Sequence, residues 1–198
     1  MIAKPRTALI LAGGQATRMG GQDKGEVILA ERRLVDHVTQ RLKAQNCDIL
    51  ISGPQDYGLG VTMIPDCDGG PKGPAAGLYA ASLYLKDTQA DLAGFFTVPV
   101  DSPAFPNDLC ERLYALNHST IASDDNGLHP VFGWWRQVDL LRLWPHLDMS
   151  NSLSLTALAQ HIHAQNSQWS GQNLFFNINT PNDMAKAAIM LDPSKKRR

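Results

Sequence analysis

The sequence lacks the cysteine pairs of a disulfide-stapled protein and the long apolar runs of a membrane protein. Its three cysteines, Cys47, Cys67 and Cys110, are an odd number without C-x-x-C spacing, so they predict neither a disulfide framework nor a zinc site. The apolar run "TALILA" is shorter than the ~7 residues of a signal-peptide core, and no run approaches the ~18 of a membrane span. We therefore expect a cytoplasmic protein that does not enter a membrane.

An excess of charge of one sign is also missing. The chain has 18 basic and 19 acidic residues, so its net charge is −1 and no overall field attracts nucleic acid. Its basic run, "KKRR" at residues 195–198, follows a proline and is interpreted as a solvated tail. We expect no nucleic-acid partner, and any anionic ligand must be bound by a local site.

What the sequence does contain is a regular alternation of strand-like and helix-like segments. The strand-like segments are residues 7–14, 47–53, 61–66, 93–101, 119–123, 129–135 and 174–179. The helix-like segments are residues 32–45, 74–87, 106–117, 137–147, 152–165 and 182–191. This order predicts a single Rossmann-like three-layer α/β/α domain with a mostly parallel sheet over residues 1–191, followed by a basic tail at 192–198.

Polar residues gather where the predicted strands end. In a mostly parallel sheet, ligands bind outside the carboxyl ends of the strands. The polar stretches at these ends are residues 13–24, 66–77, 101–103 and 177–181. They are the first places to look for a functional site.

The loop "ILAGGQATRMGGQDKG", residues 10–25, combines five glycines with Arg18 and Lys24. Backbone amides freed by glycine can cradle phosphate oxygens, and two cations add charge there; the alternative is a flexible turn with surface cations. A Walker A motif requires lysine directly after its last glycine, which Lys24 does not satisfy, and G-x-G-x-x-G is excluded because Gly13 and Gly14 are adjacent. The loop therefore predicts a phosphate site of a different type.

With its downstream matches, this loop resembles that of molybdenum cofactor guanylyltransferases, within the nucleotidyltransferase superfamily. The further matches are "GPAAGLYAA", "VPVDSPAFP", "LHPVFG" and "FNINTPND", and together they span almost the whole chain. The paired glycines after Leu11 and Ala12 look like the guanylyl-using branch, whereas related cytidylyltransferases usually carry L-A-A-G. The resemblance implies the same α/β fold.

The resemblance also implies roles for residues at the strand ends. Asp101, which ends an apolar strand, would hold Mg²⁺, a hard cation that prefers oxygen ligands. Arg18, Lys24 and Asp101 are the implied catalytic residues. Asp66 would contact the guanine base or, alternatively, stabilise its own loop. The implied nucleotide-binding residues are Leu11, Ala12, Gly13, Gly14, Lys24, Asp66, Gly73 and Asp101.

The segment "NINTP" is implied to border the pterin substrate through Asn177, Asn179 and Thr180. On a strand, Asn177 and Asn179 would face the same side. Asn179 and Thr180 have an equally good alternative as strand-end and N-cap residues of the following helix. The region after "HLDMSNS" lacks an arginine often found in related sequences, so the way the pterin phosphate is held stays open.

The resemblance implies a Mg²⁺-dependent enzyme that transfers GMP from GTP to the molybdopterin cofactor and releases pyrophosphate. The alternatives are a cytidylyltransferase of the same cofactor or another nucleotidyltransferase, and a non-catalytic nucleotide-binding chaperone for the cofactor. The expected partners are GTP, the molybdopterin cofactor, and molybdoenzyme chaperones or apoenzymes that receive the product.

Overall fold

The structure is a computed structural model that describes residues 6–13 and 23–191. Its centre is a seven-stranded sheet with the order β5-β4-β1-β6-β8-β7-β9. The strands of this sheet are β1 (Arg6–Leu11), β4 (Cys47–Ser52), β5 (Thr62–Ile64), β6 (Gly94–Pro99), β7 (Thr120–Asp124), β8 (Gly127–Arg136) and β9 (Gln165–Gln168).

Six of the seven strands run in the same direction, and β8 alone is reversed. Strand β1 pairs in parallel with β4 on one side and β6 on the other, with Ala8 opposite Ile49 and Phe96. Strand β8 is antiparallel to both β6 and β7. The mostly parallel sheet expected from the sequence is confirmed, and β8 begins at the edge where its neighbours end.

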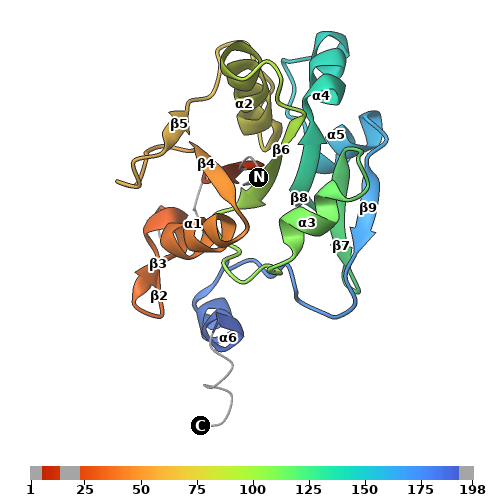
Figure 1. Ribbon diagram of the computed structural model, residues 1–198. Coiled ribbons are helices and arrows are strands. Elements are labelled where there is room, and N and C mark those ends of the chain that lie inside the picture. The colour runs from red at the N-terminus through yellow and green to blue at the C-terminus, as the bar shows by residue number, and fades with distance from the viewer. Residues whose placement is uncertain (1–5, 14–22, 192–198) are drawn as a thin grey trace, which may run out of the picture.

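Helices cover both faces of the sheet and complete three layers, as Figure 1 shows. Helices α1 (Leu34–Ala44) and α3 (Leu109–Tyr114) pack on one face. Helices α2 (Ala75–Thr88), α4 (Gln137–Leu143) and α5 (Leu155–His161) pack on the other. Strand β6 lies in the middle and is buried throughout, which explains its continuous apolar sequence.

A smaller apolar cluster attaches the C-terminal helix α6 (Pro181–Leu191) to the main domain. A two-stranded hairpin of β2 (Ile28–Leu29) and β3 (Arg32–Arg33) follows the short 3-10 helix η2 (Lys24–Glu26). Leu29 from this hairpin packs with Ile178 and Ala187. Helix α6 is therefore fixed beside the hairpin that follows Lys24.

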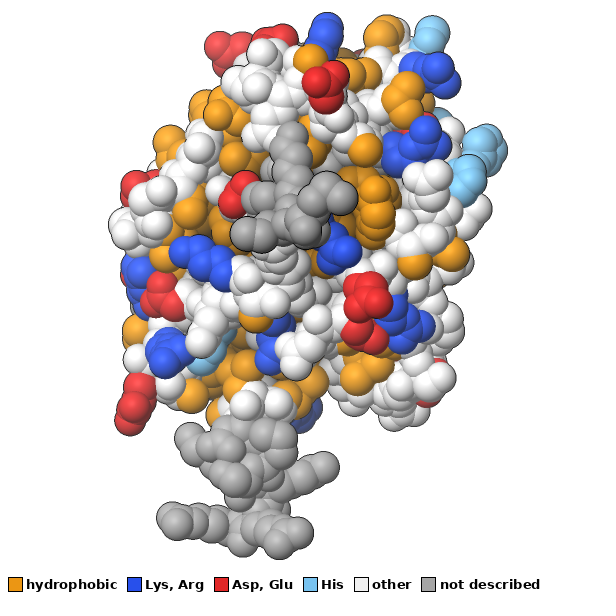
Figure 2. Space-filling model, viewed as in Figure 1, with side chains coloured by type: hydrophobic (Ala, Val, Ile, Leu, Met, Phe, Trp, Pro, Cys, Tyr) orange, Lys and Arg blue, Asp and Glu red, His pale blue; other side chains and the backbone are white. Residues whose placement is uncertain are grey.

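The surface agrees with the balanced charge. On the face shown in Figure 2, basic and acidic side chains are interspersed rather than gathered into a patch of one sign. No helix among the described residues is both long and apolar enough to cross a bilayer.

Two expected elements differ from the structure. Residues 174–179 form no strand, because their amides bond elsewhere: the Leu174 amide donates to Asp124 Oδ2 and the Ile178 amide to the Asp101 carbonyl. The helix expected over residues 152–165 ends at His161, and β9 follows it. His163, with a φ of 51°, makes the turn between them.

Candidate active site

A pocket of about 1810 Å³ lies at the edge where the parallel strands end. One half is formed by residues after β1, β4 and β5 and by the first turn of α2. The other half is formed by the end of β7, the start of β8 and residues 173–177. Asp101, directly beyond the central strand β6, lies between the two halves. This is the position at which α/β sheets bind ligands.

Lys24 forms hydrogen bonds with residues from two distant parts of the chain. Its ammonium nitrogen donates to Asp101 Oδ2 at 2.6 Å and to Asn179 Oδ1 at 2.8 Å. The lysine and aspartate side chains are 26% and 13% exposed, so solvent screens their ion pair only partly. The structure thus brings three predicted site residues into one hydrogen-bonded group: Lys24, expected to bind phosphate, Asp101, expected to bind the metal, and Asn179, expected to border the pterin substrate.

The position of Lys24 depends on the residues that flank it. Asp23 caps η2 by accepting the Gly25 amide at 2.8 Å, and the Tyr57 hydroxyl donates to both Asp23 oxygens at 2.8 and 3.0 Å. Burial and the bond to Asp23 raise the pKa of Tyr57, so the hydroxyl keeps its proton. The Tyr57 ring fills the space that a Cβ on residue 25 would need, which explains why glycine follows the lysine.

Asp101 has the features of a magnesium ligand that shares its ion with a substrate. Its second oxygen, Oδ1, is buried and has no hydrogen-bond partner among the residues that the structure describes. A buried carboxylate oxygen without a donor is costly unless a ligand completes it. No group of three His, Cys, Asp or Glu side chains within the described ranges could hold a metal alone. Magnesium is commonly held by one or two carboxylates together with substrate phosphates, and Asp101 fits that mode.

The described residues expected to bind the nucleotide all line the pocket. They are Leu11, Ala12, Gly13, Lys24, Asp66, Gly73 and Asp101, while Gly14 and Arg18 lie outside the described residues. Gly73 has a φ of 79°, which favours glycine, and Ser152 packs where its side chain would be. Asp66 is exposed at the end of β5, and both of its proposed roles remain compatible with that place.

The three residues expected to border the pterin substrate, Asn177, Asn179 and Thr180, make different contacts. Asn177 lines the pocket and accepts a hydrogen bond from the Ser102 hydroxyl, next to Asp101. Asn179 accepts from Lys24. Thr180 caps α6: its hydroxyl accepts the Asp183 amide at 3.3 Å, and Asp183 Oδ2 accepts the Thr180 amide at 2.9 Å. The expectation that a strand aligns Asn177 and Asn179 is wrong, since this segment is held by Asp101 instead of by a neighbouring strand.

The sequence alone assigned no role to several residues in the half of the pocket formed by β7, β8 and residues 173–177, which we call the acceptor half because it contains Asn177. The most notable are His129 and Asp124, whose Nε2 and Oδ1 atoms are 2.8 Å apart. The only local signal was the segment "LHPVFG", and it does not reveal that β8 starts at this edge. Their position follows from the reversed direction of β8.

The fold and the pocket define a class: an α/β protein with a ligand pocket at the carboxyl edge of its mostly parallel sheet. Residues 8–165 match the MobA-like NTP transferase domain, and the chain belongs to that family. It is accordingly an enzyme of the nucleotidyltransferase type.

Two curated relatives cover most of the chain. A molybdenum cofactor guanylyltransferase of Cereibacter sphaeroides is 34% identical over 189 residues, covering 92% of this chain and 95% of the relative. One of the same name from Yersinia pseudotuberculosis is 35% identical over 185 residues, covering 89% and 92%. A solved structure of molybdopterin-guanine dinucleotide biosynthesis protein A from Archaeoglobus fulgidus is similar in fold, with a TM-score of 0.67, 20% identity and coverage of 94% and 99%.

Proposed function

We propose that the protein transfers GMP from GTP to the molybdopterin cofactor and releases pyrophosphate. The names of the curated relatives, at 34% and 35% identity over most of the chain, support this choice of nucleotide and acceptor. The single structural observation that carries it is the position of Lys24, which bonds both to Asp101 and to Asn179. A group at that point can contact both reacting molecules.

The reaction requires positioning and charge neutralisation rather than a covalent enzyme intermediate. A terminal phosphate oxygen of the cofactor attacks the α-phosphorus of GTP, a new P–O bond forms, and the bond to pyrophosphate breaks on the opposite side. Lys24 would stabilise the charge that develops on the phosphates, because a preorganised cation acts without reorganising at the moment of reaction. Residues 11–13 would present their backbone to the triphosphate, and Arg18 is expected to add a second cation.

Mg²⁺ would be held by Asp101, whose Oδ1 has no hydrogen-bond partner among the described residues, and would neutralise phosphate charge when bound. Lys24 lies 2.6 Å from the other carboxylate oxygen, Oδ2. The triphosphate would provide the lysine with a further anionic partner.

The product is expected to pass to molybdoenzyme apoenzymes or their chaperones. We place this activity in the cytoplasm, where reduced thiols persist. Cys47, Cys67 and Cys110 are all free thiols in the structure, in agreement with a reducing compartment.

Nucleotide binding and turnover test the proposal separately. Calorimetric titration with GTP, CTP, UTP and ATP in the presence of Mg²⁺ should show GTP as the tightest ligand. A preference for CTP would favour the cytidylyltransferase alternative and leave the fold untouched. Pyrophosphate release with GTP and molybdenum-loaded molybdopterin should then be observed. Tight GTP binding without any pyrophosphate release would favour the non-catalytic chaperone.

A further inference from the structure

The acceptor half of the pocket contains an imidazole that the mechanism above does not use. His129, at the start of β8, lines the pocket, and its Nε2 lies 2.8 Å from Asp124 Oδ1. One face of its ring rests on Phe175, with the ring centroids 4.9 Å apart and the planes tilted by 35°. Two sides of the imidazole are therefore fixed, and its direction in the pocket is set before any ligand binds.

Asp124 is built as a rigid support for this ring. Its side chain is 0% exposed and accepts further hydrogen bonds from the amides of Asn126 at 2.8 Å and Leu174 at 3.2 Å. Burial alone would raise the pKa of Asp124, but the bonds from His129, Asn126 and Leu174 outweigh it and hold the pKa below its ordinary value. The carboxylate stays ionised and accepts hydrogen bonds from several sides, which holds the imidazole in place.

Cations are scarce in the pocket, although the proposed reaction brings two polyanions into it. Among the described residues of the pocket lining, only Lys24 and His129 can carry a positive charge. Four aspartates line the same space: Asp23, Asp66, Asp101 and Asp124. Lys24 lies at Asp101, so the acceptor half has His129 as its described source of positive charge. A phosphate placed there would gain from a cationic partner, because the surrounding carboxylates repel it.

We propose that His129, oriented by Asp124, binds the terminal phosphate of the acceptor. The inference rests on the proposed function and identifies how the attacking group is held. With Nε2–H directed at Asp124, the Nδ1 atom has no hydrogen-bond partner within the described part of the chain. The side chain is 22% exposed, so a ligand in the pocket can reach it. A protonated ring donates Nδ1–H to a phosphate oxygen in a charge-assisted hydrogen bond.

This role supplies a cation on the acceptor side, where the sequence lacks the arginine expected after residue 152. The same side of the pocket carries Asn177 and the Phe175 ring, which offer an amide and an aromatic surface to the rest of the acceptor. His129 would then position the nucleophile, while Lys24 acts between the two reacting phosphates.

Steady-state kinetics with a matched control test the assignment. His129→Gln keeps a polar side chain but removes the imidazole, and His118→Gln makes the same change at an exposed site. We expect His129→Gln to raise the KM for molybdopterin by roughly tenfold or more, with the KM and calorimetric Kd for GTP unchanged. His118→Gln should match the wild type. An unchanged KM for molybdopterin in a wild type that does turn over would overturn the role of His129 and leave guanylyl transfer standing.

A structural role of His129 would give a different pattern. Loss of the contact between the His129 and Phe175 rings would lower the melting temperature and weaken the binding of GTP and of the acceptor together. This result would also overturn the proposal. If His129→Gln does not fold, the wild type labelled at its histidine rings provides the answer. Its His129 resonance, assigned through Asp124→Asn, should shift on addition of molybdopterin and not on addition of GTP with Mg²⁺ alone. The reverse response would contradict acceptor binding, and a wild type that binds no GTP at all would refute the proposed function instead.

Discussion

Lys24 Nζ lies 2.6 Å from Asp101 Oδ2, although 77 residues separate the two along the chain. Each side chain neutralises the other, which lowers the cost of keeping both partly buried. The two groups on which the proposed chemistry depends are thus paired with each other, and removing either one has a distinct expected effect.

Lys24→Ala should weaken triphosphate binding and slow transfer. A charged hydrogen bond contributes roughly 1.5–3 kcal/mol, which corresponds to about a 10- to 150-fold loss in kcat/KM. The variant should stay folded, since the ion pair with Asp101 is partly exposed and its lysine packs at the pocket rather than in the core. Lys43→Ala on the exposed side of α1 is the control. Unfolding by circular dichroism, with full activity in the remaining folded fraction, would show that the lysine is structural.

Asp101→Asn should abolish Mg²⁺-dependent turnover with little loss of fold. Asparagine keeps the shape and one oxygen but removes the charge that attracts a hard cation, so the barrier should rise by several kcal/mol, on the order of a thousandfold in rate. The measurement is a Mg²⁺ titration of pyrophosphate release.

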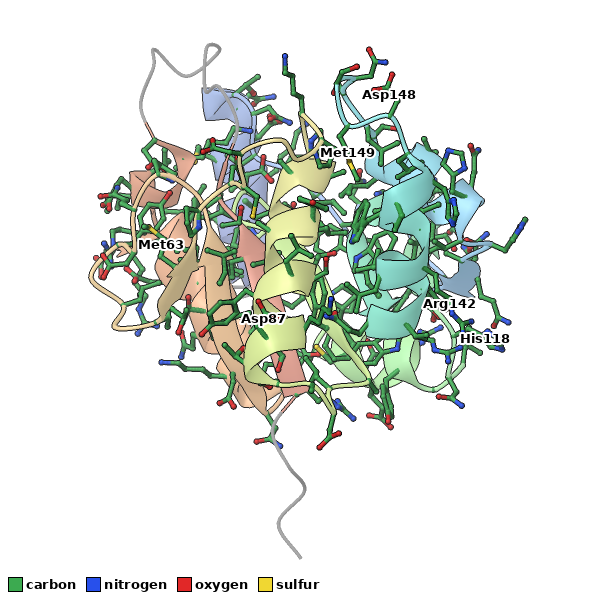
Figure 3. All side chains as sticks on the ribbon, turned by 90° about the horizontal axis from the view of Figure 1, so that it is seen from above. Met63, Asp87, His118, Arg142, Asp148 and Met149 are labelled. Atoms are coloured by element: carbon green, nitrogen blue, oxygen red, sulfur yellow. The ribbon has the colours of Figure 1, made fainter. Side chains whose placement is uncertain are left out.

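Asp87→Asn is the control for this substitution. Asp87 lies near the far end of α2, roughly 15 Å along the helix from the turn that faces the pocket. Figure 3 shows it beside the lower part of α2, well below Asp148 and Met149. Wild-type turnover and wild-type metal dependence in Asp101→Asn would remove the metal role.

Asp124→Asn should lower the melting temperature in a pH-dependent way. The folded state holds the pKa of Asp124 below the value of about 3.9 that an unfolded aspartate has. Its contribution to stability is fully present above that value and is lost as pH falls through the folded pKa. The difference in melting temperature between wild type and variant should therefore be largest near neutrality and shrink below about pH 3.9. Asp91→Asn, at an exposed position, should show no such trend, and a constant difference for Asp124→Asn would count against this account.

Gly53→Ala should weaken GTP binding by moving the loop after β1. A Cβ at residue 53 would lie 2.9 Å from the Ala12 Cβ and 3.2 Å from its carbonyl carbon, closer than these atoms tolerate. Crowding of this kind costs about 1–3 kcal/mol, and part of it should appear as a raised Kd in calorimetry. Ala12→Gly in the same chain removes the nearest atom and should recover part of the affinity. If affinity is not recovered, the loss caused by Gly53→Ala does not arise from displacement of the loop at Ala12.

Much of the fold follows from sequence pattern, because the strands of the parallel sheet are apolar and end in polar loops. The elements that the pattern does not reveal have local reasons. The hairpin of β2 and β3 turns at Ala30 and Glu31, whose φ angles of 47° and 69° usually require glycine or asparagine. Strand β9, with the sequence QNSQ, has neither apolar alternation nor β-branched residues, and only its ladder with β7 defines it.

The sequence predicts the site residues that follow the carboxyl ends of strands, such as Asp101. It does not predict His129, whose place in the site depends on the reversed direction of β8. Asp101 and Lys24 were expected near one another because the loops after parallel strands meet at one edge. His129 comes at the start of a strand, so the same rule places it at the opposite edge unless that strand is known to be reversed. Nothing in the local sequence states the direction of β8, and the imidazole was overlooked for this reason.

The hydrogen bond from the Ile178 amide to the Asp101 carbonyl, 2.8 Å long, has a consequence for biosynthesis. A nascent chain that has emerged as far as residue 168 contains every strand of the sheet but not the amide that fixes the backbone of Asp101, nor Asn179 that holds Lys24. Asp101 and Lys24 are thus held by residues that the chain contributes only after β9. A chain truncated after residue 168 would lack both of these hydrogen bonds.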